Sequence, residues 1–325
     1  MPNWKSSLCH RKHPALLVLL TACLSSMNQG CATSAGPRPE EPLKISDSPG
    51  PDVPKTVPFK QTSGMATYSV AGSEDSSALD GKSKKGPKPA KGQKQQSVAW
   101  FTCQLEKAAG VVLLAHDEDS GFDSRDFCNN TEVQAFLASG FNVAGFNRPG
   151  FGNSTGQRDL VGKQSQQAAL VAAEAILKAN AGIGGTYSGS YGYGTGAAAA
   201  AFFAKQSGNL QWLIVGGGMF DFEQVARNSD DHSLVELIKK SAAKEGEVAY
   251  EIRSIGYDVN GLPARVAIFR GKDDTISPHD QAHAFRDGLA ASECKVTFQE
   301  IAGIGHKIGP RQMRQILDVM ITSVR

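Results

Sequence analysis

The chemistry available to this sequence centres on a histidine, an acid and a turn that has lost its nucleophile. His306 and Asp274 lie late in the chain and have the residue types of a general base and the acid that orients it. Residues 192–196, Gly-Tyr-Gly-Thr-Gly, have the G-x-S-x-G form of a nucleophile turn, but Gly194 stands where the serine belongs. Glycine has no side chain and therefore cannot attack a substrate.

The stretch around Gly194 predicts a strand, a tight glycine-rich turn and a helix over residues 186–205. Such a turn holds its central residue at positive φ, which glycine adopts at little cost. A second register, S-x-S-x-G at residues 188–192, would make Ser190 the nucleophile. We prefer the Gly194 register, because it places the small residue Gly196 where the helix must approach the sheet.

The elements that must position these residues alternate between strand and helix. This alternation predicts an α/β domain over residues 97–325, with a mainly parallel sheet and helices on both faces. Residues 219–262 interrupt it with a helical cap insertion, over the strand ends where α/β sheets bind ligands. Apart from the turn region, the predicted strands are 98–105, 111–115, 141–146, 210–215, 265–270 and 295–300, and the predicted helices are 131–139, 164–180, 278–291 and 310–324.

Four landmarks in a fixed order together resemble the α/β-hydrolase family, over roughly residues 97–325. They are Leu-Leu-Ala-His-Asp at 113–117, the loop Phe-Asn-Arg-Pro-Gly-Phe-Gly-Asn-Ser-Thr-Gly at 146–156, the Gly194 turn, and Phe-Arg-Gly-Lys-Asp-Asp-Thr-Ile-Ser-Pro at 269–278 followed by Gly-Ile-Gly-His at 303–306. The second landmark resembles the family's R-G-x-G-x-S loop with Pro149 inserted, in a form similar to a phospholipid-lipase branch. The resemblance implies an esterase- or lipase-like ancestry and an acyl, ester or lipid-like ligand.

The resemblance also assigns roles to individual residues. It implies His306 as the base and Asp274 as its acid, with Asp221 a less favoured acid. It implies an oxyanion hole built from the backbone N–H groups of Thr195 and of Asp117 or Glu118. Backbone donors survive the loss of a serine, so an anion or a carbonyl group could still be held there.

A hydrolase-like framework with no nucleophile at Gly194 leaves two classes of function open. One is a non-catalytic binding or scaffold protein that uses the inherited cleft. The other is an active hydrolase, through Ser190 or through a water activated by His306 and Asp274. Removing a triad serine costs about a million-fold in turnover, which favours the first class. We expect an empty volume at Gly194 where a serine hydroxyl would lie, so that Gly194→Ser would place its Oγ near His306.

The amino-terminal part predicts export and anchoring. Residues 1–23 have a positive start and a short apolar run, and end in Leu-Thr-Ala-Cys, which resembles a bacterial lipobox with Cys23 as the lipidated residue. The alternative is an ordinary signal cleaved near Ala35. Leu24, in place of Asp, favours the outer membrane of the bacterial envelope. Residues 24–96 are rich in Pro, Gly, Ser and Lys and predict a disordered tether.

Composition narrows the partners and cofactors. A net charge of +2 argues neither for nor against nucleic acid, and we expect the lysine run at 82–94 to be a solvated linker, although it could lie on an anionic membrane. No dinucleotide motif and no C-x-x-C pair occurs, so we predict no cofactor and no metal. Cys103 and Cys128 are open to two interpretations, a disulfide bridge or two buried thiols.

Overall fold

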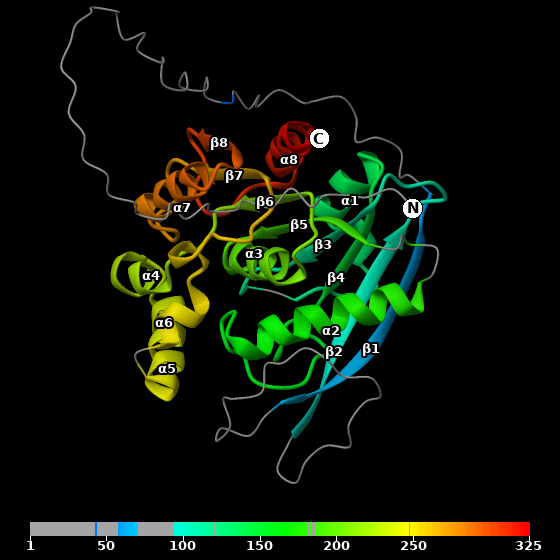
Figure 1. Cartoon of the computed structure of the whole chain (residues 1–325), viewed down its shortest axis with the longest axis horizontal. Helices are drawn as coiled ribbons and strands as arrows, with labels where there is room; N and C mark the ends of the chain where they lie inside the picture. Colours follow the sequence, from blue (N-terminus) through cyan, green and yellow to red (C-terminus); the bar gives the residue numbers. More distant parts are fainter. Residues whose placement is uncertain are drawn as a thin grey trace, which may run out of the picture.

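The computed structural model describes a sheet of eight strands with helices on both faces (Figure 1). The predicted signal with Cys23, the lysine run and most of the predicted tether lie outside the described residues. In the part of the chain that is described, no helix has the length and apolarity needed to cross a bilayer. The described residues are 43, 58–70, 94–119, 121–180, 183, 186–246 and 248–325.

The strand order is β1-β2-β4-β3-β5-β6-β7-β8, in which β1, β2 and β4 pair antiparallel and all later neighbours pair parallel. The central strands are short and buried at every residue, as the apolar run Val-Val-Leu-Leu-Ala of β3 predicts for a sheet covered on both faces. The strands are β1 Lys60–Val70, β2 Lys94–Gln104, β3 Val111–Ala115, β4 Asn142–Phe146, β5 Tyr187–Tyr193, β6 Trp212–Gly216, β7 Arg265–Gly271 and β8 Lys295–Ile301.

The helices form two layers, each with its own buried cluster. Buried side chains of α2, α3 and α7 belong to one cluster, and those of α1 and α8 belong to the other. Figure 1 shows α2 and α3 on one side of the sheet and α1 and α8 on the other. Between β6 and β7, at the predicted insertion, the chain forms α4, α5 and α6. The helices are α1 Thr131–Ala138, α2 Lys163–Ala179, α3 Thr195–Ser207, α4 Phe222–Asn228, α5 His232–Glu245, α6 Val248–Arg253, α7 His279–Ala291 and α8 Pro310–Val324, with short 3-10 turns at Phe127–Asn129 and Ile255–Tyr257.

The predicted tether is wrong for residues 60–70, which form the edge strand β1. This strand pairs with β2 along its whole length, and β2 itself begins at Lys94, before the predicted domain start. The sequence of β1 is mostly polar because an edge strand buries only part of one face. On that face the side chain of Tyr68 is buried, and its hydroxyl donates a hydrogen bond to Oε1 of Gln96 over 2.9 Å.

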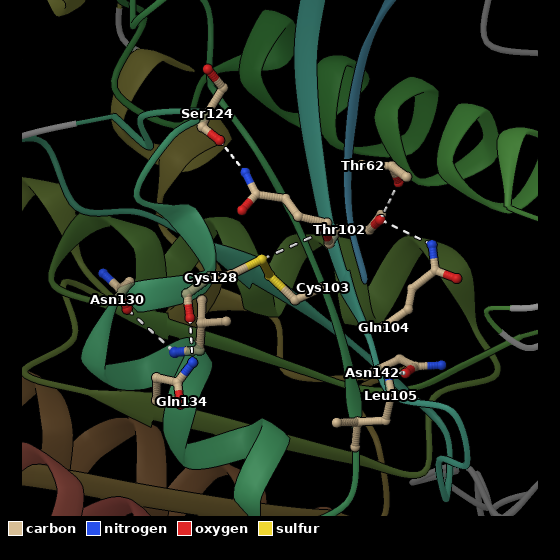
Figure 2. Close-up of a disulfide and its surroundings, with 12 residues drawn as sticks. Thr62, Thr102, Cys103, Gln104, Leu105, Ser124, Cys128, Asn130, Gln134 and Asn142 are labelled. Carbon is tan, nitrogen blue, oxygen red and sulfur yellow. Dashed lines mark hydrogen bonds between the residues drawn. A yellow bond between two sulfur atoms is a disulfide. The ribbon is translucent and has the colours of Figure 1, made fainter. Parts of the chain in front are cut away.

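Cys103 and Cys128 form a disulfide, which decides between the two interpretations of this pair. The bridge joins β2 to the 3-10 turn before α1, with 5.8 Å between the Cα atoms (Figure 2). The bridge therefore ties the segment between β3 and α1 to the sheet. This segment begins with His116 and Asp117, the last two residues of the first landmark.

Candidate functional site

The Gly194 turn has the backbone of a nucleophile elbow. β5 ends at Tyr193, α3 begins at Thr195, and Gly194 between them has φ +57° and ψ −124°. A Cβ atom on Gly192 would lie 2.0 Å from the carbonyl oxygen of Gly196, so the strand and the helix approach each other too closely for a larger residue. The turn is therefore built as the Gly194 register predicts.

The expected empty volume at Gly194 is wrong, because a carboxylate fills it. A Cβ atom built on Gly194 would lie 2.3 Å from Cγ and from both carboxyl oxygens of Asp117. Asp117 follows β3 and reaches the turn from the neighbouring strand. The missing serine side chain thus leaves the space that Asp117 uses.

Asp117 also takes the hydrogen bonds of the predicted oxyanion hole. The backbone N–H groups of Thr195 and Glu118 each donate to Oδ1 of Asp117 over 2.7 Å, and the hydroxyl of Thr195 donates to the same oxygen over 3.0 Å. The two backbone groups converge on one point, as the family resemblance implies. The acceptor at that point is Oδ1 of Asp117, where the resemblance would place a substrate oxygen.

His306 lies between two carboxylates. Its Nδ1 is 2.9 Å from Oδ2 of Asp274, within the range expected for a working pair, and its Nε2 is 3.5 Å from Oδ2 of Asp117. The side chains of His306 and Asp274 are 8% and 0% exposed, and that of Asp117 is 23% exposed. We call these three residues the central site.

The acid of this site is fixed by its own loop. Oδ1 of Asp274 accepts hydrogen bonds from the backbone N–H groups of Ile276 and Ser277, which leaves Oδ2 for His306. Asp221, the less favoured acid, instead caps α4 through the N–H groups at its first turn and accepts a hydrogen bond from Tyr257. The structure therefore brings Asp274, and not Asp221, to the histidine.

The central site holds a proton on its histidine. Burial alone would lower the pKa of His306, but the hydrogen bonds that its ring donates to the Asp117 and Asp274 carboxylates outweigh burial and raise the pKa from 6.5 to about 9. Burial alone would raise the pKa of Asp117, but the His306 contact and the two backbone N–H groups lower it. The raised pKa favours the protonated form of His306 at neutral pH.

Ser190, the alternative nucleophile, lies elsewhere. It is in the middle of β5 and fully buried, and its hydroxyl donates a hydrogen bond to the carbonyl oxygen of Ala200 in α3 over 3.0 Å. The structure does not bring it to His306, whose Nε2 faces Asp117 at the elbow.

Sequence reasoning missed the polar side chains beneath Asp117. Arg148, from the 146–156 loop, is buried and lies 3.1 Å from the Glu118 carboxylate and 3.0 Å from the Thr195 hydroxyl. His116 donates from Nδ1 to the carbonyl oxygen of Asp117 and accepts the Arg148 N–H at Nε2. Burial, reinforced by the Arg148 charge, lowers the pKa of His116 to about 3, so it is neutral. The only signal was the clustering of polar residues directly after a buried strand.

Comparison with known proteins establishes the fold. No protein-family model and no curated protein matches the sequence. Among solved structures, an acylaminoacyl peptidase from Pyrococcus horikoshii superimposes with a TM-score of 0.58 at 14% identity, over 81% of this chain and 41% of the peptidase chain. An esterase from Pyrococcus furiosus matches with a TM-score of 0.54 at 15% identity, over 70% of this chain and 87% of the esterase. Acetyl xylan esterase 1 from Thermoanaerobacterium matches with a TM-score of 0.51 at 12% identity, over 71% and 78% of the two chains.

The likeness to the peptidase covers only part of its chain. The chain spans less than half the length of the acylaminoacyl peptidase chains that it resembles. At these identities the likeness describes the fold, and the fold is that of the α/β hydrolases.

Proposed function

We propose that this protein is a catalytically silent α/β-hydrolase-fold protein that acts as a binding or scaffold module through the inherited cleft. The observation that carries the proposal is the Asp117 carboxylate in the place of the nucleophile side chain. It occupies the space above Gly194 and accepts the backbone hydrogen bonds that an ester substrate would need.

Serine-hydrolase chemistry needs a nucleophile, free oxyanion donors and an unprotonated base. Gly194 supplies no nucleophile. The donors from Thr195 and Glu118 are bound to Asp117. His306, with a pKa of about 9, carries a proton at neutral pH and cannot accept another. The same argument weighs against a water activated by His306, and the hydrogen bond to Ala200 weighs against Ser190.

The ligand that we propose for the cleft is an acyl, ester or lipid-like molecule. The fold neighbours include esterases and an acylaminoacyl peptidase, which supports this class. A ligand that carries a carboxylate would compete directly with Asp117 for the same two N–H groups.

We also propose that the protein is exported and anchored in the bacterial envelope, in the outer membrane, through a lipidated Cys23. The Cys103–Cys128 bridge supports export, because such bridges persist in oxidising compartments. Mass spectrometry of the membrane fraction should find lipid on Cys23 as the mature amino terminus, and Cys23→Ser should release the protein. A wild-type protein that is soluble and starts near Gly36 would contradict the anchor.

The activity proposal is tested with a fluorophosphonate probe on the wild type and two variants. The wild type should not label. Gly194→Ser alone should also stay unlabelled, because its Cβ would meet the Asp117 carboxylate and His306 would stay protonated. The double variant Asp117→Ala/Gly194→Ser should label, because the hydroxyl then gains space, free donors and a neutral base.

A third variant, Asp117→Ala alone, is the matched control and should stay unlabelled. Labelling of the wild type would contradict the proposal directly. Equal labelling of Gly194→Ser and the double variant would show that Asp117 does not block the site.

A further inference from the structure

Two histidines and a glutamate that are exposed or partly exposed converge at the β8 edge of the sheet. His279 and His283 are one helical turn apart at the start of α7, so their imidazoles share a face of the helix. Glu300 lies on β8, against which α7 packs. We call these three residues the edge cluster and propose that it binds a divalent transition metal, with Zn²⁺ as the best fit.

The ligand atoms lie within about 0.4 Å of the spacing that a zinc ion requires. Nε2 of His279 is 3.0 Å from Nε2 of His283, and these atoms are 3.1 Å and 3.4 Å from Oε1 of Glu300. A tetrahedral zinc ion with bonds of about 2.0–2.1 Å holds its ligand atoms about 3.3–3.4 Å apart. Small side-chain rotations would therefore complete one face of the tetrahedron.

The surroundings orient two of the three ligands. Nδ1 of His279 is 3.3 Å from the Asp280 carboxylate, the type of contact that fixes the ring of a metal-binding histidine. Arg270, buried on β7, donates from Nη1 to Oε1 of Glu300 over 3.1 Å and holds that carboxylate in place. Its Nη2 donates to the carbonyl oxygen of Asp274.

The donor set decides which metal fits. Two imidazoles and one carboxylate suit zinc and its neighbours, whereas Mg²⁺ and Ca²⁺ prefer sets of oxygen ligands. The Arg270 guanidinium beside Glu300 opposes any cation, so binding depends on the imidazoles. His279 is 52% exposed, so solvent can supply the fourth ligand. The metal would join the first turn of α7 to β8.

The test is a Zn²⁺ titration of the untagged full chain in competition with a chromophoric chelator, with Co²⁺ absorption as a second readout. We expect one ion for each chain and a visible Co²⁺ spectrum of low-coordinate type. His279→Gln, His283→Gln and Glu300→Gln should each weaken Zn²⁺ binding at least tenfold, and His279→Gln/His283→Gln should abolish it. His232→Gln, at an exposed position on α5, should leave the affinity unchanged.

The controls separate this site from other imidazoles. Thermal unfolding in EDTA should be the same for the wild type and the double variant, since the cluster is at the surface. Zn²⁺ should raise the unfolding temperature of the wild type and not that of the double variant. No binding by the wild type, or equal binding by the double variant, would overturn the proposal.

Discussion

The central site and the edge cluster use the same side-chain types in opposite ratios. At the centre one imidazole lies between two carboxylates, of which Asp274 is buried and Asp117 is partly exposed. At the edge two imidazoles share one carboxylate and stand partly in solvent. The centre therefore carries excess negative charge, and a proton on His306 neutralises part of it. The edge has two ring nitrogens and one carboxylate oxygen within 3.4 Å of one another, a donor set that suits a cation.

Under the function that we propose, the difference is that between a hydrolase-like site filled by its own fold and a surface cluster that remains open. At the centre the carboxylate of Asp117 satisfies the oxyanion donors and the base together. The closure depends on two positions that are far apart in the sequence. Gly194 provides the space, and Asp117 provides the oxygen.

The largest expected difference between the two sites is in stability. His306→Ala leaves two carboxylates without their partner in a buried place, which should cost about 3–5 kcal/mol of unfolding free energy. His279→Ala removes a half-exposed ring and should cost less than about 1 kcal/mol in EDTA. Urea unfolding at pH 7 measures both. Similar costs for the two variants would break the contrast between a closed and an open site.

The next effect is the pH dependence of stability. The pKa of His306 is higher in the folded state, about 9 against 6.5, so its contribution is complete below pH 6.5 and is lost as the pH rises through 9. The loss should reach at most about 3 kcal/mol. His116 acts in the other direction, since its contribution falls as the pH drops from 6.5 towards 3.

Chemical unfolding at intervals between pH 6.5 and 9.5 checks the sign. Asp117→Asn should flatten this slope, and His279→Gln/His283→Gln should leave it unchanged. A wild-type stability that increases over this range would show that His306 is not protonated in the fold.

The smallest effect separates backbone strain from the contact with Asp117. Gly194 and Gly208 both have positive φ, +57° and +65°, but a Cβ at Gly208 would meet no atom within 4 Å. Gly208→Ala should cost about 1 kcal/mol from strain alone. Gly194→Ala should cost at least about 1 kcal/mol more, because its ψ of −124° lies outside the left-handed region in which Gly208 has ψ 3°, and because it displaces the carboxylate. The part due to the carboxylate should vanish in the Asp117→Gly background, and an unchanged cost there would contradict the contact.

Much of the fold could be predicted from local patterns. The apolar run of β3 and the glycines around residue 194 each constrain the backbone by themselves. The order of strands and helices then gives the α/β-hydrolase architecture. The edge strand β1 was missed, because a strand that buries one side chain such as Tyr68 has almost no apolar periodicity.

The content of the site could not be predicted in the same way. Sequence order indicated where Asp274 and His306 would lie, because strand ends meet at one edge of a parallel sheet. The sequence shows that Gly194 lacks a side chain, but not which distant side chain fills the space. That depends on the rotamer of Asp117 and on the loop beneath it, which Arg148 and His116 support. The edge cluster could not be predicted as a whole, because the sequence shows two histidines one helical turn apart but not that Glu300 on β8 lies beside them.

The protonation of His306 in the wild-type protein tests the central claim most directly. Nitrogen NMR of histidine-labelled protein, with His306 assigned through His306→Gln, follows both ring nitrogens against pH. If Asp117 and Asp274 hold the imidazolium between them, both nitrogens should remain protonated at pH 7.5, with a midpoint near 9. The midpoint should fall in Asp117→Asn. A neutral ring at pH 7.5 with a midpoint at or below 6.5 would contradict the claim that Asp117 closes the site.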